Sequence, residues 1–310
     1  MTTETNMTNF ANIAGENRVT RVPPSEKLLA TSISHLKQKI TAKLKGEYAS
    51  FEQNAQHLAK AFSPIRTLIE QDPHAVASLD VLYKLAKKDQ RRRIQADKQL
   101  IDPGLATTFT FTANPGSFSV IAPPYDVQWT TPDSPKSAVT RASKDTGELY
   151  CQLISGGRYD RAAAVGVFLS SPVRSLVRFS PVAPFSWSWE LWNQYGQGTS
   201  TKGGVGVMAY LNADSKPFLD KQAILWNESR VNPSLGEKDF GGSWISAALF
   251  PGTVSILMEP GNTYLVWVWC WVMRHTWVWR YTPELGTVYA KIGCSVPFIV
   301  VDSGPPPHIG

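Results

Sequence analysis

Residues 264–273 read Tyr-Leu-Val-Trp-Val-Trp-Cys-Trp-Val-Met. In an extended strand successive side chains point to opposite faces, so one face carries Leu, three Trp and Met, and the other carries Tyr, three Val and Cys. Because neither face is polar, the stretch predicts a central strand that is covered on both sides. We expect the Val and Cys face in a sandwich interior and the Trp face under the helical part of the chain. The alternative is an exposed Trp ladder that stacks on sugar rings.

The sequence around this stretch keeps the same period of two. From Leu105 onward, runs with alternating apolar residues are separated by turn clusters such as Asn114-Pro115-Gly116 and Pro260-Gly261-Asn262. No helical pattern stands between these runs, which argues against a parallel nucleotide-binding sheet. We therefore predict that residues 105–303 form an antiparallel β-sandwich of the jelly-roll type, followed by a Pro-rich tail at 304–310.

The N-terminal third has a different pattern. After a polar arm at residues 1–24, which we expect to be flexible, Ser25 is a candidate N-cap, and apolar residues then recur with a mean step of about 3.7, the period of a helix. They are Leu29, Ile33, Leu36, Ile40, Leu44, Tyr48, Phe51, Ala55, Leu58 and Phe62. Pro64 and Pro73 restart helices, and the last helix runs to about residue 100. The sequence thus predicts an α-helical hairpin or coiled-coil-like bundle over residues 25–104; Gly46 either ends the first helix or lies within it.

Most of the net positive charge lies in this N-terminal third of the chain. Residues 1–104 carry 16 Lys or Arg and 11 Asp or Glu, whereas the rest of the chain carries 15 and 14. A dense basic cluster, in which Lys87, Lys88, Arg91, Arg92 and Arg93 stand close together, is either a solvated helix face or a contact for an acidic partner. We expect no nucleic-acid binding, because no aromatic residues are interleaved with these basic side chains. The apolar stripe predicts a homo-oligomer that forms through residues 25–100.

All 11 Trp lie after residue 104, and a second aromatic cluster spans Phe185–Gly196. The cluster is bounded by Pro184 and by glycine-rich sequence, so we predict that part of it is a loop that carries the recognition site. Its rings would stack on a ligand while its polar groups hydrogen-bond to it, although the same rings could instead seal the sandwich edge. The candidate ligand-binding residues are Trp187, Trp189, Glu190, Trp192, Asn193 and Tyr195.

The sequence shows no recognisable catalytic machinery. His275 is the sole plausible base in the β part and has no partner at a suitable spacing. Gly203-Gly204-Val205-Gly206 precedes a strand, not a helix, so a phosphate loop is not predicted. Three Cys at 151, 270 and 294 cannot form a full disulfide framework, and we expect buried reduced thiols. We predict no enzyme activity, no metal site and no cofactor.

Two functional hypotheses remain from the sequence. The first is a non-enzymatic binding or assembly protein, in which the helices mediate oligomerisation or attachment and the Trp-rich sandwich recognises a carbohydrate or a protein surface. The second is a membrane-active, pore-forming type of toxin, in which the helical part acts on a membrane and the sandwich binds a receptor. Because the chain has no apolar run typical of a signal peptide, we expect a cytoplasmic protein, with export by another route left open.

Overall fold

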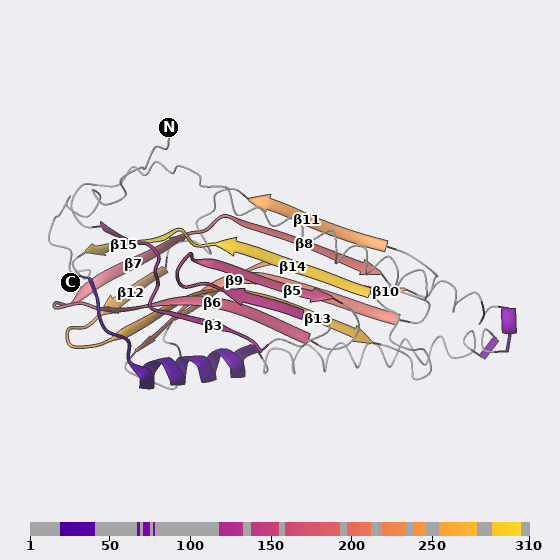
Figure 1. Ribbon diagram of the computed structural model, residues 1–310, viewed down its shortest axis with the longest axis horizontal. Helices are drawn as coiled ribbons and strands as arrows, with labels where there is room; N and C mark the ends of the chain where they lie inside the picture. The colour runs from indigo at the N-terminus through magenta and orange to yellow at the C-terminus, as the bar shows by residue number, and fades with distance from the viewer. Residues whose placement is uncertain are drawn as a thin grey trace, which may run out of the picture.

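The computed structural model is built mainly from antiparallel strands (Figure 1). It describes residues 19–40, 67–68, 71–74, 77, 118–132, 138–154, 159–192, 197–211, 217, 219–232, 238–245, 254–277 and 287–304. The strands described there form three sheets and run along the long axis of the molecule. Every strand pair among them is antiparallel, as the alternating sequence predicts.

The central layer is a six-stranded sheet that contains the Trp-rich strand. β13 lies in its middle, hydrogen-bonded to β6 on one side and to β9 on the other, and β10 continues beyond β9. Two short strands, β1 and β3, share the far edge of β6. The six strands are β1 (Thr20–Arg21), β3 (Val127–Thr130), β6 (Tyr159–Ser170), β9 (Gln197–Leu211), β10 (Leu219–Asn232) and β13 (Tyr264–Trp277).

The second layer consists of two sheets that follow one another end to end (Figure 1). The five-stranded sheet has the order β11-β8-β14-β5-β4, and the four-stranded sheet has the order β12-β7-β15-β2. Two connections that the structure describes, from β7 to β8 and from β14 to β15, join the two sheets, and Ser295 N donates to Pro184 O where these connections meet (3.0 Å). Their bounds are β2 (Phe118–Ile121), β4 (Ala138–Ala142), β5 (Glu148–Ile154), β7 (Ser175–Val182), β8 (Phe185–Trp192), β11 (Lys238–Ile245), β12 (Val254–Met258), β14 (Thr287–Ser295) and β15 (Phe298–Gly304).

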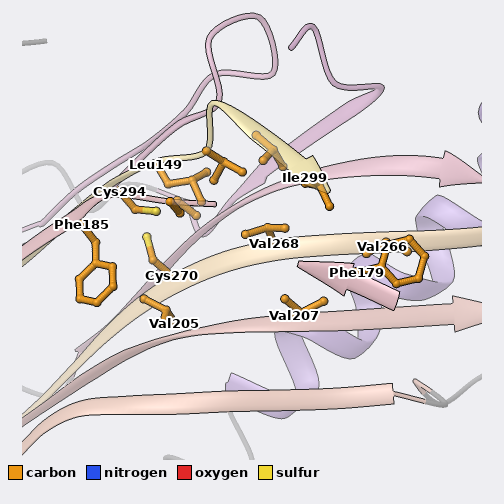
Figure 2. Packing of buried hydrophobic residues seen from close by; sticks show 14 of the residues in the cluster. Leu149, Phe179, Phe185, Val205, Val207, Val266, Val268, Cys270, Cys294 and Ile299 are labelled. Atoms are coloured by element: carbon orange, nitrogen blue, oxygen red, sulfur yellow. The ribbon is translucent and has the colours of Figure 1, made fainter. Parts of the chain in front are cut away.

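Each face of the six-stranded sheet has its own apolar core. The Val and Cys face of β13 packs against the inner faces of the second layer, as Figure 2 shows for Val266, Val268 and Cys270. The opposite face carries Trp267, Trp269 and Trp271, which are at most 2% exposed. The prediction that β13 is covered on both faces is therefore confirmed.

A helix at residues 26–40 covers the Trp face (Figure 1). Ser25 caps it as predicted, because its Oγ accepts a hydrogen bond from Leu28 N (3.4 Å). Leu28, Leu36 and Ile40 are buried against the tryptophans, and Trp267 Nε1 donates to Ser32 Oγ at 3.1 Å. Because burying an indole N–H without an acceptor is costly, this hydrogen bond fixes where the helix sits on the sheet.

The prediction of a separate helical hairpin followed by a jelly roll is wrong. Apart from isolated helical residues at 67–68, 73–74 and 77, the described residues contain one helix, 26–40, and no helical hairpin. This helix packs as a third layer on the six-stranded sheet. Helical periodicity shows that a helix has an apolar face but not what covers that face; here the cover is the sheet, which buries Leu36 and Ile40 of the stripe that we assigned to oligomerisation. The second layer is divided into two sheets, unlike the two-sheet jelly roll that we predicted.

Several predictions concern residues outside the described ranges. These are the continuity of the helix at Gly46, the contribution of most of residues 41–100 to an oligomer, the basic cluster at residues 87–93, and the predicted tail at residues 304–310 apart from Gly304, which ends β15. Within the predicted N-terminal arm, Val19 is buried, and Thr20 and Arg21 pair with β6 as β1.

Candidate functional site

The aromatic segment singled out in the sequence forms a strand as far as residue 192. β8 lies between β11 and β14, so its side chains alternate between the sandwich interior and the outer face of the five-stranded sheet. Trp189 points inward and is 7% exposed, and Trp187 also packs against the inner core. Glu190 points to the outer face. The alternation of the strand thus separates these two rings from the carboxylate that was expected to assist them.

Trp187 is held by a chain of contacts across the layers. Its ring stacks on Trp226 of β10, with centroids 5.3 Å apart and planes 16° apart. Trp226 Nε1 donates to Thr201 Oγ1 (3.2 Å), and that hydroxyl donates to Met273 O (3.2 Å). The half-buried Trp187 therefore helps to close the interior between the five-stranded and six-stranded sheets. The Trp192 side chain, Asn193 and Tyr195 lie outside what the structure describes, so their role in binding stays a prediction.

The outer face of the same sheet carries the candidate site. Its rows follow from the register: Tyr289 lies between the buried Ile154 and Glu190, Lys291 lies between Gln152 and Ser188, and Gly293 lies between Tyr150 and Ser186. Arg141 of β4 extends the last row beyond Tyr150. The candidate site comprises Arg141, Tyr150, Gln152, Ser186, Ser188, Glu190, Tyr289, Lys291 and Gly293.

Two local features shape this face. The Lys291 ammonium lies 5.6 Å from the centroid of the Tyr289 ring, a cation–π contact that positions both side chains near the centre of the sheet. Gly293 leaves a methyl-sized gap in the next row, since a Cβ placed there would lie 3.6 Å from Ser186 Oγ and 3.7 Å from Tyr150 Cδ2. The gap separates a hydroxyl from a ring edge. Tyr150, Ser186, Tyr289 and Lys291 are half-buried, whereas Gln152 is buried and Arg141 is exposed.

Most of these residues were missed by the sequence analysis, although a signal for them existed. Tyr150 and Gln152 occupy the outward positions of a strand whose inward positions are Leu149, Cys151 and Leu153. An outward Tyr next to an outward Gln in such a strand is a candidate for a surface site. The sequence analysis instead assigned the site to Phe185–Gly196, because tryptophans are dense there.

Two findings on the described residues bear on a metal ion or a cofactor. Within the described ranges, no three side chains among His, Cys, Asp and Glu come together in a way that could hold a metal ion. A cavity beside the end of the helix, lined by Lys39, Asp160, Arg161 and Trp269 among others, has room for about one water molecule. In the part of the chain that the structure covers, no helix is long and apolar enough to span a membrane.

Comparison with known proteins gives few similarities. No protein-family model matches the chain, and no curated protein matches it. Among solved structures, the carbohydrate-binding module CBM61 in complex with β-1,4-galactotriose aligns over 57% of this chain and 88% of its own, with 10% identity and a TM-score of 0.19. A GH31 α-xylosidase from Xanthomonas citri aligns over 61% of this chain and 21% of its own, with 10% identity and a TM-score of 0.13. Scores this low carry no functional argument.

Proposed function

We propose that this chain is a non-enzymatic carbohydrate-binding protein, whose ligand lies on the outer face of the five-stranded sheet across β5, β14 and β8. The observation that carries the proposal is the composition of that face. Two tyrosines lie there among an amide, two hydroxyls, a carboxylate, an ammonium and a guanidinium.

This mixture suits a sugar ring better than it suits an apolar ligand. A pyranose has an apolar C–H face that packs on an aromatic ring and a rim of hydroxyls that both donate and accept hydrogen bonds. Tyr150 and Tyr289 supply rings, while Gln152 and Ser188 flank Lys291 in the row between them. Tyrosine also gives a large contact area with few rotatable bonds, so little side-chain entropy is lost on binding.

The spacing of carboxylates on this face favours binding over hydrolysis. Glycoside hydrolysis uses two carboxyl groups about 5–10 Å apart. Among the described side chains on this face, Glu190 lies opposite Tyr289 and Glu148 lies opposite Ser295. Those two positions are six residues apart along β14, which is about 20 Å at 3.4 Å per residue. The two carboxylates are therefore too far apart to act on one glycosidic bond.

The proposal is tested with a glycan array, followed by calorimetric titration of the best ligand. We expect Tyr289→Ala and Tyr150→Ala each to weaken binding at least about tenfold, which corresponds to about 1.4 kcal/mol. Because both rings lie on the outer face, the melting temperature should change little.

A matched control is Arg178→Ala, which removes an exposed side chain from β7 in the same layer but on the four-stranded sheet. This variant should bind the glycan as the unmodified chain does. Absence of binding to any glycan, or Tyr289→Ala and Tyr150→Ala variants that retain full affinity, would refute the proposal. Binding to a protein surface instead would be detected as capture of a protein partner that the glycan does not compete away.

A further inference from the structure

All three cysteines meet in the interior between the two layers. Cys151 of β5 and Cys294 of β14 lie on the inner face of the five-stranded sheet, on neighbouring strands. Cys270 of β13 reaches toward them from the six-stranded sheet, and Figure 2 shows Cys270 and Cys294 facing one another across the interior. Each is buried, with exposures of 0% for Cys151 and Cys270 and 6% for Cys294.

Cys151 and Cys270 are already in contact. Their Sγ atoms are 3.8 Å apart, and the Cys151 thiol also lies 3.7 Å from the carbonyl oxygen of Cys270. A disulfide requires about 2.05 Å between the sulfurs, so a rotation of the two side chains that closes about 2 Å would join them. We propose that Cys151 and Cys270 form an inter-sheet disulfide when the chain folds in the presence of an oxidant, and that Cys294 remains a free thiol.

The oxidant that we name is a small disulfide such as oxidised glutathione. One cysteine thiolate attacks a sulfur of this disulfide, forms a mixed disulfide and releases one glutathione thiolate. The second cysteine thiolate then attacks the protein sulfur and displaces the second glutathione. Two cysteine thiols are oxidised, one glutathione disulfide is reduced to two thiols, and the two cysteine protons pass to solvent or to the released thiolates.

This exchange has to take place before the layers close. Exchange requires thiolates and a path for the oxidant. In the folded chain, burial is the main cause that raises the pKa of the Cys151 thiol, and burial also raises the pKa of Cys294. Because Cys151 and Cys270 have no exposed surface, glutathione disulfide cannot reach them. The folded, reduced protein should therefore resist oxidation, whereas the folding chain should not.

The positions of Lys and Arg allow the cysteine pairing to be determined by peptide mapping. Trypsin places each cysteine in a separate peptide: Cys151 in residues 145–158, Cys270 in residues 239–274 and Cys294 in residues 292–310. The full chain is refolded from denaturant in a mixture of reduced and oxidised glutathione, then blocked with an alkylating agent under denaturing conditions. Mass spectrometry should find peptides 145–158 and 239–274 linked and Cys294 alkylated.

Two further measurements separate this pairing from its rivals. Cys294→Ser should keep the cross-link after the same refolding, and the cross-linked form should unfold at a higher urea concentration than the reduced form. Folded, reduced protein incubated with oxidised glutathione for the same time should retain three free thiols. A link between peptides 239–274 and 292–310, a link between peptides 145–158 and 292–310, or three alkylated cysteines after oxidative refolding would overturn the proposal.

Discussion

Truncation of one leucine on the buried side of the helix tests how strongly the helix packs on the Trp face of the six-stranded sheet. Leu36 is fully buried, on the same side of the helix as Leu28 and Ile40, and belongs to the cluster formed with Trp267 and Trp269. In Leu36→Ala the helix keeps its cap and its hydrogen bond between Ser32 and Trp267. Only the apolar contact is lost, so the variant isolates the contribution of packing.

The expected magnitude follows from burial. The substitution removes three carbon atoms from the core, and about 0.8 kcal/mol for each gives a transfer loss of about 2.4 kcal/mol. A cavity between the rigid indole rings adds to this loss, because tryptophans held by neighbouring strands cannot collapse into it. Leu→Ala substitutions in cores cost about 2–5 kcal/mol, and we expect the upper half of this range.

The assay is equilibrium unfolding in urea, followed by tryptophan emission. Gln38→Ala is the matched control, since it changes an exposed residue of the same helix and should cost less than about 0.5 kcal/mol. A helix of this length is marginal in isolation, so if Leu36→Ala detaches it, Trp267 becomes exposed and its emission shifts to the red. An unfolding free energy within 0.5 kcal/mol of that of the unmodified chain, with unchanged emission, would refute the packing argument.

Two further predictions concern the interior, the first with a control on the outer face. Gly203→Ala should destabilise the fold by about 1–3 kcal/mol or more in urea unfolding, because the added Cβ would lie 1.9 Å from the Trp226 ring. Gly293→Ala meets only ordinary contacts and should be nearly neutral. Equal losses of unfolding free energy in the two variants would contradict this prediction. Tyr125→Phe should cost about 1–2 kcal/mol near neutral pH through loss of the 2.9 Å hydrogen bond to Val296 O. Burial is the main cause that raises the Tyr125 pKa, so the unfolded chain ionises first above pH ~10, and the advantage of Tyr125 over Phe should shrink there; a gap that widens above pH 10 would be the contrary result.

The local pattern of β13 predicted its surroundings because strand alternation is a local property. A stretch that is apolar on both faces has to be buried on both faces, and the helical part was the available cover for the Trp face. Both inferences are confirmed by the burial of Trp267, Trp269 and Trp271 and by their contact with the helix. One residue of that contact was not predicted. Ser32 is polar, so the sequence alone does not mark it as buried. The structure shows why it is buried, because its hydroxyl accepts a hydrogen bond from the Trp267 indole.

The candidate site could not be predicted in the same way. A count of aromatic residues in Phe185–Gly196 does not show that β8 would point Trp187 and Trp189 inward and Glu190 outward. The stack of Trp187 on Trp226 joins strands of different sheets, and the rows of the outer face join three strands from distant parts of the chain. These contacts depend on register, which is set by pairings that a single sequence does not specify.

The glycines of β9 show how register gives meaning to a segment that is ambiguous by itself. Gly203-Gly204-Val205-Gly206 is not a phosphate loop, and a run of glycines ordinarily weakens a strand. On the Trp face of the six-stranded sheet, Gly204 lies beside Trp271 and Gly206 lies beside Trp269. On the opposite face of this sheet, the Trp226 ring packs over Gly203. A Cβ at Gly206 would lie 2.4 Å from Trp269 Nε1, so the indole fits only where the neighbouring strand has no side chain. The glycine-rich and tryptophan-rich strands are therefore complementary, and each is evidence that the other is its neighbour.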